Sequence, residues 1–303
     1  MSGIQMLSLA IARVTGIGSG SASLSKLKDT NESSSSLPDD DVTSPASLRL
    51  ASMPGSTNGG ALMLEVKEVG CAKAKGQPIF SDVSFNVYEG DVVMLQGKSG
   101  SGKSTLLKCL AHLNLYDGEI LYRGRIPQSY GIPKYRTRVL YVPQRPSLLP
   151  GTPRDFLNTI LSFNSLSPKP NHHKSGLRRS GAESFDPHTE PILVAKEWGI
   201  DEELWDRTWS NLSGGEGQRI ALAVAVGLQS ADVLLLDEPT SALDADASVT
   251  IEQYLTKAVR SKDGGLSAIV WITHSPEQGG RVGTRFLRIS EGSVHEENAD
   301  GGV

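Results

Sequence analysis

The chain has 303 residues, a formal net charge of -4 and a hydrophobic content of 38%. A slightly acidic chain lacks the excess of basic side chains that grips phosphates, so we expect no nucleic-acid partner. The longest apolar run, Ile220–Leu228, is far shorter than the about 20 residues of a membrane-spanning helix, so we expect no membrane crossing. Two cysteines, Cys71 and Cys109, without metal-ligand spacing, argue against a disulfide framework or a zinc module and favour a reducing compartment.

The first 60 residues differ in composition from the rest. They carry four serines at Ser33–Ser36, an acidic run at Asp39–Asp41 and a glycine-rich stretch at 54–60, without apolar periodicity. Such a segment buries too little apolar area to offset the entropy of ordering, so we predict a disordered extension over 1–60. Its serines, and the lack of acidic residues before Asp29, leave a regulatory tail or an organellar targeting segment as alternatives.

The chain from Ala61 onward has the apolar patterns of a folded domain. Apolar side chains alternate with polar ones at 62–66 and again at 83–87, which predicts two strands. Val92–Leu95 is a continuous apolar run, which is typical of a strand that is buried on both faces. Leucines at helical spacing over 106–113 predict a helix shortly after it.

A further buried strand is predicted at Val139–Val142 and a helix at 154–163. Residues 164–190 then interrupt the pattern with prolines, serines and glycines, so we predict an inserted surface loop. His172, His173 and His188 in this loop could bind a metal ion, but adjacent histidines in a polar loop are more often solvated.

Helices and strands alternate through the rest of the chain. We predict helices and buried strands in the order 192–199, 220–228, Val233–Leu236, 249–259 and Ala268–Ile272, and then a closing hairpin at 286–294. This alternation predicts an α/β fold with a parallel sheet and helical crossovers. The folded domain is expected at 61–297, with a short tail at 298–303.

A glycine-rich motif lies between the strand Val92–Leu95 and the helix that follows it. Its pattern is G-x-x-x-x-G-K-[ST], whose glycines let backbone N–H groups point at phosphate oxygens, next to the partial positive charge of a helix start. Lys103 is expected to reach the β- and γ-phosphates and Ser104 to bind Mg²⁺. A glycine-rich turn without a ligand is the alternative, which the flanking strand and helix disfavour. The predicted nucleotide-binding residues are Gly97, Lys98, Ser99, Gly100, Ser101, Gly102, Lys103, Ser104 and Thr105.

Two carboxylates follow the buried strand Val233–Leu236. Asp237 and Glu238 are expected at the carboxyl edge of the sheet, where open α/β folds bind their ligands. Asp237 suits a Mg²⁺ shell, and Glu238 suits a general base that activates water toward the γ-phosphate. A strand that simply ends in solvent is the alternative, and the phosphate-binding motif disfavours it.

A second anion-facing helix start is predicted at Leu212–Glu216. The Ser213 hydroxyl and the N–H groups of Gly214 and Gly215 suit an anion at the beginning of a helix. The chain already carries one phosphate cradle, so we expect this second one to serve the nucleotide of a second molecule.

The set and order of these motifs resemble the ATP-binding cassette (ABC) ATPases, over about residues 62–295. The similar segments are Gly97–Ser104 for Walker A, Gln144 for the Q-loop, Leu212–Glu216 for the signature, Val233–Asp237 with Glu238 for Walker B and the catalytic glutamate, Ser241–Asp244 for the D-loop and His274 for the switch histidine. The spacing agrees, with 41 positions from Lys103 to Gln144, 24 from Ser213 to Asp237 and 36 from Glu238 to His274.

The resemblance implies a P-loop NTPase with a RecA-like parallel sheet core, an antiparallel β subdomain and an α-helical signature subdomain. It also implies a composite site, in which each ATP lies between Walker A of one cassette and the signature of another. Glu238, His274 and Gln144 would be catalytic, and Ser213, Gly214, Gly215 and Asp244 would contact nucleotide. Ser104, Gln144 and Asp237 would bind Mg²⁺.

The partners that the resemblance implies are a second cassette, as an ATP-bound homodimer, and a membrane permease on another chain. The location would be the cytoplasmic face of a membrane. The stretch 144–153 looks most like the free-standing ATPase subunits of bacterial iron exporters and of the plant aluminium-tolerance half-transporter. Two alternatives stay open: a soluble ABC ATPase without a permease, in cofactor assembly or translation, and a scaffold that binds ATP without turnover. Glu238 and His274 argue against the scaffold.

The sequence departs from the family pattern at three places. The family usually stacks adenine on an aromatic ring from the first strands, but Val69–Lys75 contains none, which puts the preference for ATP over GTP in doubt. The signature carries Glu216 where Gln is commoner, and Gly217 replaces a basic residue. The loop 164–190 enlarges the expected helical subdomain.

Overall fold

The computed structural model describes residues 59–73, 76–144, 150–162, 185–261 and 265–297. The predicted extension 1–60, except its last two positions, and the tail 298–303 lie outside the described residues. The same is true of most of the predicted loop 164–190, including His172 and His173. Its last residues, 185–190, form a turn that leads into a helix starting at Glu190. Within the described part of the chain, no helix has both the length and the apolar character that a bilayer crossing requires.

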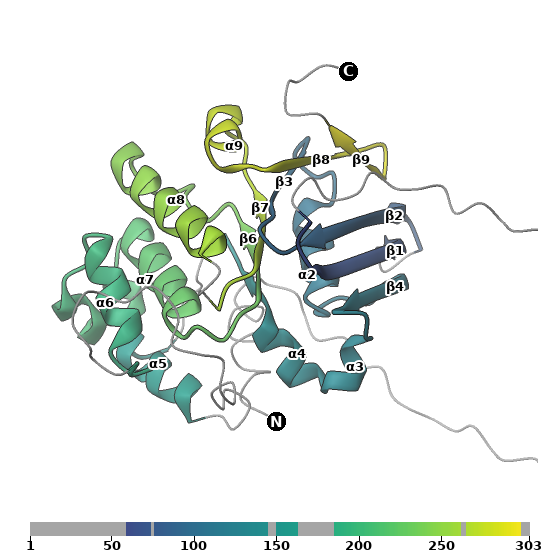
Figure 1. Cartoon of the computed structure of the whole chain (residues 1–303). Helices are drawn as coiled ribbons and strands as arrows, with labels where there is room; N and C mark the ends of the chain where they lie inside the picture. Colours follow the sequence, from purple (N-terminus) through teal and green to yellow (C-terminus); the bar gives the residue numbers. More distant parts are fainter. Residues whose placement is uncertain (1–58, 74–75, 145–149, 163–184, 262–264, 298–303) are drawn as a thin grey trace, which may run out of the picture.

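Three antiparallel strands form the smaller sheet (Figure 1). Their order is β2 (Pro78–Tyr88), β1 (Leu62–Ala72) and β4 (Asp117–Tyr122). Val66 of β1 pairs with Phe85 of β2 and with Ile120 of β4, and all three side chains are buried. The two predicted strands are therefore confirmed, and β4, which the sequence analysis did not predict, pairs with β1.

Six strands form the larger sheet, and all except the last run parallel to their neighbours. Their order is β5 (Val139–Val142), β6 (Val233–Asp237), β7 (Ala268–Ile272), β3 (Val92–Gly97), β8 (Arg285–Ser290) and β9 (Ser293–Glu297). Successive side chains point into different cores, so that Met94 packs on the helical side and Leu95 on the side of the smaller sheet. Burial on both faces explains the continuous apolar runs of these strands.

Helix α2 (Lys103–Leu110) lies between the two sheets (Figure 1). Leu106, Leu107 and Leu110 are fully buried in a core that also contains Val66 of β1 and Leu95 of β3. The predicted helix after β3 is confirmed. Two short helices, α3 (Pro127–Tyr130) and α4 (Ile132–Arg138), connect β4 to β5.

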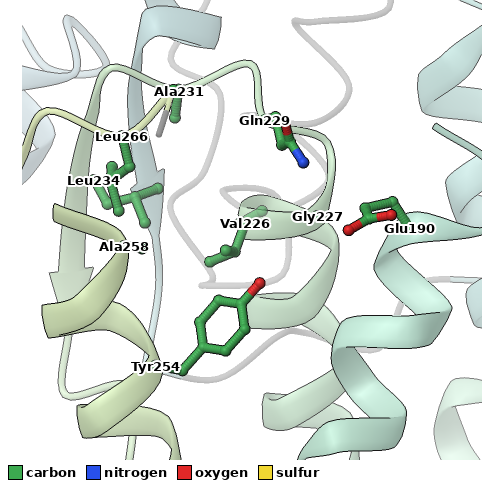
Figure 2. Close-up of a pocket in the computed structure, with 11 residues that line it drawn as sticks. Glu190, Val226, Gly227, Gln229, Ala231, Leu234, Tyr254, Ala258 and Leu266 are labelled. Atoms are coloured by element: carbon green, nitrogen blue, oxygen red, sulfur yellow. The ribbon is translucent and has the colours of Figure 1, made fainter. Parts of the chain in front are cut away.

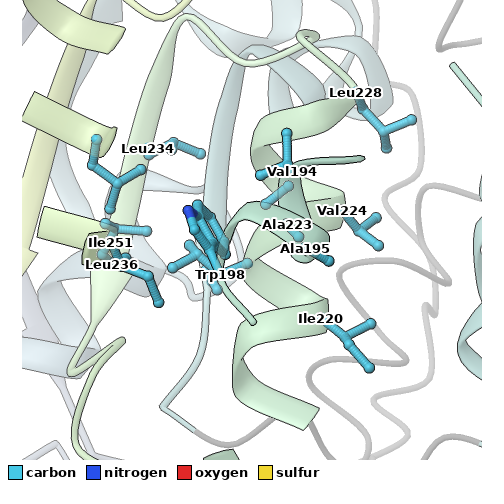
Figure 3. Close-up of a cluster of buried hydrophobic side chains, with 14 of the residues drawn as sticks. Val194, Ala195, Trp198, Ile220, Ala223, Val224, Leu228, Leu234, Leu236 and Ile251 are labelled. Atoms are coloured by element: carbon cyan, nitrogen blue, oxygen red, sulfur yellow. The ribbon is translucent and has the colours of Figure 1, made fainter. Parts of the chain in front are cut away.

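Helices cover the other face of the larger sheet. They are α5 (Pro153–Leu161), α6 (Glu190–Glu197), the 3₁₀ turns η2 (Glu202–Asp206) and η3 (Trp209–Asn211), α7 (Gly214–Gly227) and α8 (Ala245–Arg260). Figure 3 shows Trp198 at the centre of this layer, near Leu234 and Leu236 of β6 and Ile251 of α8. Its ring packs edge-on against Tyr254 at 5.3 Å between centroids. The last helix, α9 (Pro276–Val282), connects β7 to β8.

Candidate nucleotide-binding and hydrolysis site

The loop between β3 and α2 can be built only with glycine at its two ends. Gly97 has a φ of +150°, and a Cβ there would lie 2.7 Å from the carbonyl oxygen of Ile289. Gly102 has a φ of +100°, and a Cβ there would lie 2.8 Å from Ile79. These positions let the chain curl into a loop that ends at the N-terminus of α2.

The predicted phosphate-binding residues occupy this loop and the first turn of α2. Lys98, Ser99 and Gly100 are exposed at its tip, while Ser101, Gly102, Ser104 and Thr105 are partly buried. Lys103 is only 6% exposed, and its Nζ donates to the carbonyl oxygens of Gly97 at 2.8 Å and Lys98 at 3.0 Å.

Burial lowers the pKa of Lys103, and the carboxylates of Glu238 and Asp237 act against this lowering. The ammonium group therefore lies inside a curled loop of backbone dipoles and close to two carboxylates. A polyphosphate bound to the loop would give the ammonium group stronger acceptors than these carbonyls.

Ser104 and Asp237 meet at the carboxyl edge of the sheet. The Ser104 hydroxyl donates to Oδ1 of Asp237 at 3.0 Å, and the Tyr141 hydroxyl donates to Oδ2 at 2.9 Å. A hydroxyl beside a carboxylate is the hard oxygen donor set that Mg²⁺ prefers when phosphates complete its shell. The residues present therefore fit Mg²⁺.

Tyr141 is a site residue that the sequence analysis missed. It lies in the buried strand β5, and burial, with Asp237 as the second cause, raises the pKa of its hydroxyl well above the usual range. Tyr141 therefore stays protonated and donates to Asp237, which leaves the other oxygen of that carboxylate toward Ser104. Its position inside an apolar run gave no signal of a polar contact.

The three predicted catalytic residues meet, because Gln144 and His274 both contact the carboxylate of Glu238. Its Oε2 accepts from Nε2 of Gln144 at 2.7 Å, and its Oε1 lies 2.9 Å from Nε2 of His274. Gln144 follows β5, Glu238 follows β6 and His274 follows β7, so three adjacent parallel strands deliver these side chains to one edge.

The predicted signature forms the start of α7. Ser213 is the N-cap residue, and its hydroxyl oxygen accepts from the N–H of Glu216 at 3.2 Å. The carboxylate of Glu216 in turn accepts from the N–H of Ser213 at 2.7 Å. Glu216, the departure from the usual Gln, therefore closes a capping box at this helix start.

The D-loop packs against the signature of the same chain. A Cβ on Gly215 would lie 3.0 Å from the carbonyl oxygen of Ala242, so the helix start and the D-loop touch. Asp244 is the N-cap residue of α8 and accepts from the N–H of Ala247 at 2.8 Å. Ser213 and Asp244 thus bond within their own helix starts, whereas the N–H of Ser241 of the same D-loop donates to the carbonyl oxygen of Glu238 at 3.2 Å.

A cavity in the helical layer lies away from this site (Figure 2). Among the residues that line it are Ala231 just before β6, Leu234 of β6, Gly227 at the end of α7 and Tyr254 of α8. Its volume of about 40 Å³ is far below the roughly 300 Å³ at which small-molecule sites begin. Because it lies at the opposite end of β6 from Asp237, it is not the nucleotide site.

The segment Val69–Lys75, where the family usually carries an aromatic ring, is described as far as Lys73. Cys71 of β1 is buried, and its thiol donates to the carbonyl oxygen of Leu115 at 3.5 Å. Ala74 and Lys75 lie outside the described residues. A Cβ on Gly102 would lie 2.8 Å from Ile79 and 3.1 Å from the ring of Phe80, both of β2, and the Phe80 side chain is buried in the core.

The parallel sheet, the curled loop before α2 and the two carboxylates at the carboxyl end of β6 define a P-loop nucleoside triphosphatase. A family model described as ABC transporter matches residues 80–241, and the chain belongs to this family. The P-loop NTPase fold expected from the sequence is thus confirmed, and the protein is an ABC-type ATP hydrolase.

Relatives agree with this assignment. The chain is 30% identical over 219 residues to the putative ABC transporter ATP-binding protein YjkB of Bacillus subtilis, covering 72% of this chain and 78% of the relative. It is 32% identical over 224 residues to the phosphate import ATP-binding protein PstB 1 of Vibrio cholerae, covering 71% of this chain and 76% of that protein.

Solved structures agree as well. A dimeric structure of MJ0796, described as a bacterial ABC transporter cassette, has a TM-score of 0.64 at 27% identity and covers 79% of this chain and 100% of its own. A dimeric MJ0796 structure in a post-hydrolysis state, bound to ADP and Pi, has a TM-score of 0.61 at 26% identity, with the same coverage of both chains.

Proposed function

We propose that this chain binds ATP and Mg²⁺ at Gly97–Thr105 and that Glu238 is the general base of hydrolysis. The observation that carries this proposal is the Glu238 carboxylate, which lies between the Gln144 amide and the His274 imidazole at 2.7 and 2.9 Å. Asp237, the residue before it, bonds to Ser104 on the phosphate-binding loop. The proposed base Glu238, the proposed metal-binding pair Ser104 and Asp237, and the phosphate-binding loop therefore lie at one edge of the sheet.

In this reaction, the Glu238 carboxylate accepts a proton from water as the water oxygen bonds to the γ-phosphorus. The bond from that phosphorus to the bridging oxygen breaks, which gives ADP and inorganic phosphate. Lys103 compensates the charge on the β- and γ-phosphates, and His274 donates to the γ-phosphate. Ser104, Gln144 and Asp237 would hold Mg²⁺, which neutralises charge on the phosphate oxygens when bound.

The site is completed by a second copy of the chain. The start of α7, with Ser213, Gly214 and Gly215, presents a helix N-terminus, and Asp244 lies in the adjoining D-loop. Ser213 and Asp244 bond within their own helix starts and not to the phosphate-binding loop of the same chain, so this group suits the nucleotide of a partner. The dimeric MJ0796 structures support this arrangement.

ATP hydrolysis by this chain drives a membrane permease on another chain, at the cytoplasmic face of the membrane. Relatives described as phosphate and Fe(3+) import ATP-binding proteins support this part of the proposal. The stretch 144–153 resembles that of the ATPase subunits of bacterial iron exporters and of the plant aluminium-tolerance half-transporter. Sedimentation of the native protein with membranes, and its release by alkaline carbonate, tests this part. A protein that stays in the supernatant of gently lysed cells would favour an ATPase without a permease.

The chemistry is tested by Glu238→Gln, which keeps the shape of the side chain and removes its basicity. Loss of a general base lowers turnover by about 10²–10⁴-fold, while ATP still binds because the phosphate-binding loop is unchanged. The measurements are phosphate release and ATP titration calorimetry. Glu203→Gln, at an exposed acid of η2, is the control. Hydrolysis by Glu238→Gln at the wild-type rate would remove Glu238 from this role.

A further inference from the structure

The side-chain amide of Gln218 connects three backbone segments of the site. Gln218 belongs to α7 and is 3% exposed. Its Nε2 donates to the carbonyl oxygens of Gln144 at 2.9 Å and of Glu238 at 3.0 Å, and its Oε1 accepts from the N–H of Ala242 at 3.2 Å. One buried side chain is therefore bonded to the Q-loop, to the catalytic glutamate and to the D-loop.

All three bonds go to main-chain atoms, so they fix the course of the backbone beneath the reacting side chains. Both N–H groups of the Gln218 amide are used, each toward a different carbonyl. Glu238 has a φ of +49°, a left-handed conformation that persists only where its surroundings define it. Its carbonyl oxygen accepts from Gln218 and from the N–H of Ser241 at 3.2 Å. A loosened Glu238 backbone would displace its carboxylate from Gln144 and His274.

The same helix carries the signature. Gln218 lies five positions after Ser213, on α7, whose start touches the D-loop through Gly215 and Ala242. A rigid helix therefore runs from the group that faces a partner's nucleotide to the amide that holds the chain's own Glu238.

We infer that Gln218 is a positioning residue for hydrolysis, which holds the backbones of Glu238 and Gln144 in the reactive arrangement and ties them to the signature helix. This inference rests on the proposed function, because it needs Glu238 as the base. Gln218 does not touch the reacting atoms and acts through Glu238. Its removal should therefore lower kcat and leave ATP binding unchanged.

A second glutamine, Gln278, contacts the chain segment between Glu238 and Ala242 through Thr240. Nε2 of Gln278 on α9 donates to the Thr240 hydroxyl at 2.8 Å and to Oε1 of Glu252 at 2.8 Å. Glu252 is buried and paired with Arg281 at 2.9 Å. Thr240 therefore stays anchored when Gln218 is changed, so we expect the segment to loosen on one side rather than unfold.

The test is Gln218→Met, which has nearly the same length and volume and makes none of the three bonds. The exposed Gln253→Met on α8 is the matched control. We expect kcat to fall at least tenfold in Gln218→Met, with KM and the calorimetric affinity for ATP within twofold of wild type. Rates are expressed per bound nucleotide, so that a smaller folded fraction does not imitate slower chemistry. An unchanged kcat, or a loss confined to KM, would overturn the inference.

The shorter amide of Gln218→Asn is the second variant, for use if Gln218→Met does not bind ATP in full stoichiometry. It cannot reach Gln144 and Glu238 together, so the same loss of kcat is expected, and an unchanged kcat again overturns the inference.

Single-turnover rates in the Glu238→Gln background show whether Gln218 acts through the Glu238 carboxylate. Gln218→Met should slow this variant by a smaller factor than it slows wild type, because the part of its effect that passes through the Glu238 carboxylate is already absent.

A full tenfold loss in that background would show that Gln218 acts independently of Glu238, which contradicts the inference. The outcomes separate the two ideas. If Glu238→Gln alone hydrolyses at the wild-type rate, the proposed function fails. If Glu238→Gln is inactive and Gln218→Met is fully active, only the inference about Gln218 fails.

Discussion

Glu238 and Asp237 are neighbours in the chain, yet their carboxylates have different partners. The left-handed backbone of Glu238, with a φ of +49°, turns the chain as it leaves β6. Such a conformation costs roughly 1–3 kcal/mol, and here the N–H of Glu238 donates to Ile272 at 3.1 Å as part of the surroundings that hold it. As a result, Asp237 bonds to Ser104 and Glu238 to Gln144. The proposed metal ligand, Asp237, and the proposed base, Glu238, therefore face different partners although they are adjacent in the chain.

Lys103 is the side chain whose loss should weaken ATP binding most directly. Lys103→Ala removes a charge-assisted contact to the phosphates worth about 1.5–3 kcal/mol, so we expect ATP affinity to fall roughly tenfold or more. Titration calorimetry measures it, with the exposed Lys257→Ala as the control. Equal ATP affinity of Lys103→Ala and wild type would contradict the role given to Lys103.

The absence of an aromatic ring over Val69–Lys75 predicts weak discrimination between purines. The proposed phosphate contacts come from backbone groups of the loop and from Lys103, and these groups do not distinguish one base from another. We therefore expect ATP and GTP to support turnover within a few-fold of each other in kcat/KM. A preference above ~100-fold, or about 2.8 kcal/mol, would mean that another residue reads adenine.

The capping box at the start of α7 makes a stability prediction with a defined pH dependence. Glu216→Ala removes the carboxylate that accepts from Ser213, and we expect a loss of about 0.5–1 kcal/mol at pH 7, since the side chain is partly open to solvent. That backbone bond is the main cause that lowers the pKa of Glu216 below its ordinary value of 4.5. The folded state therefore favours the charged form.

The stabilisation by this charge is fully present above pH 4.5 and is lost as the pH falls through the lowered pKa. Urea unfolding of wild type and Glu216→Ala should thus differ at pH 7 and converge in acid. Glu203→Ala serves as the control. A difference that grows as the pH falls would show that the charge of Glu216 does not stabilise the helix start.

The strands of the larger sheet could be predicted because burial on both faces gives continuous apolar runs, as in Val92–Leu95. Strand β4 could not, because only Ile120 and Tyr122 of its six residues are buried and the others are polar or partly exposed. Helices α3 and α4 escaped prediction because Gly131 and Pro133 break the apolar pattern there.

The motif residues were predictable because each follows a strand or begins a helix, and the structure brings Gln144, Glu238 and His274 together. Gln218 was not, because its partners Gln144 and Glu238 are 74 and 20 positions away. Such contacts depend on the packing of α7 against the segments that follow β5 and β6. A local pattern in the sequence contains no trace of them.

The proposed site is divided between two copies, because the Lys103 and Glu238 group and the Ser213 group serve different nucleotides. With ATP bound and hydrolysis blocked, the γ-phosphates should hold two copies together. We therefore expect Glu238→Gln with ATP and Mg²⁺ to elute as a dimer in size-exclusion chromatography, and the same protein with ADP as a monomer.

Ser213→Arg tests which surface forms that dimer. It places a long side chain at the helix start and removes the cap to Glu216, so Glu238→Gln/Ser213→Arg should elute as a monomer with ATP. Ser210→Arg, at an exposed position just before the signature, controls for the added charge. If the isolated chain stays monomeric throughout, crosslinking in the membrane-bound assembly repeats the comparison. A double mutant that dimerises as well as Glu238→Gln would place the interface elsewhere, because an Arg at Ser213 leaves no room for a partner's phosphates.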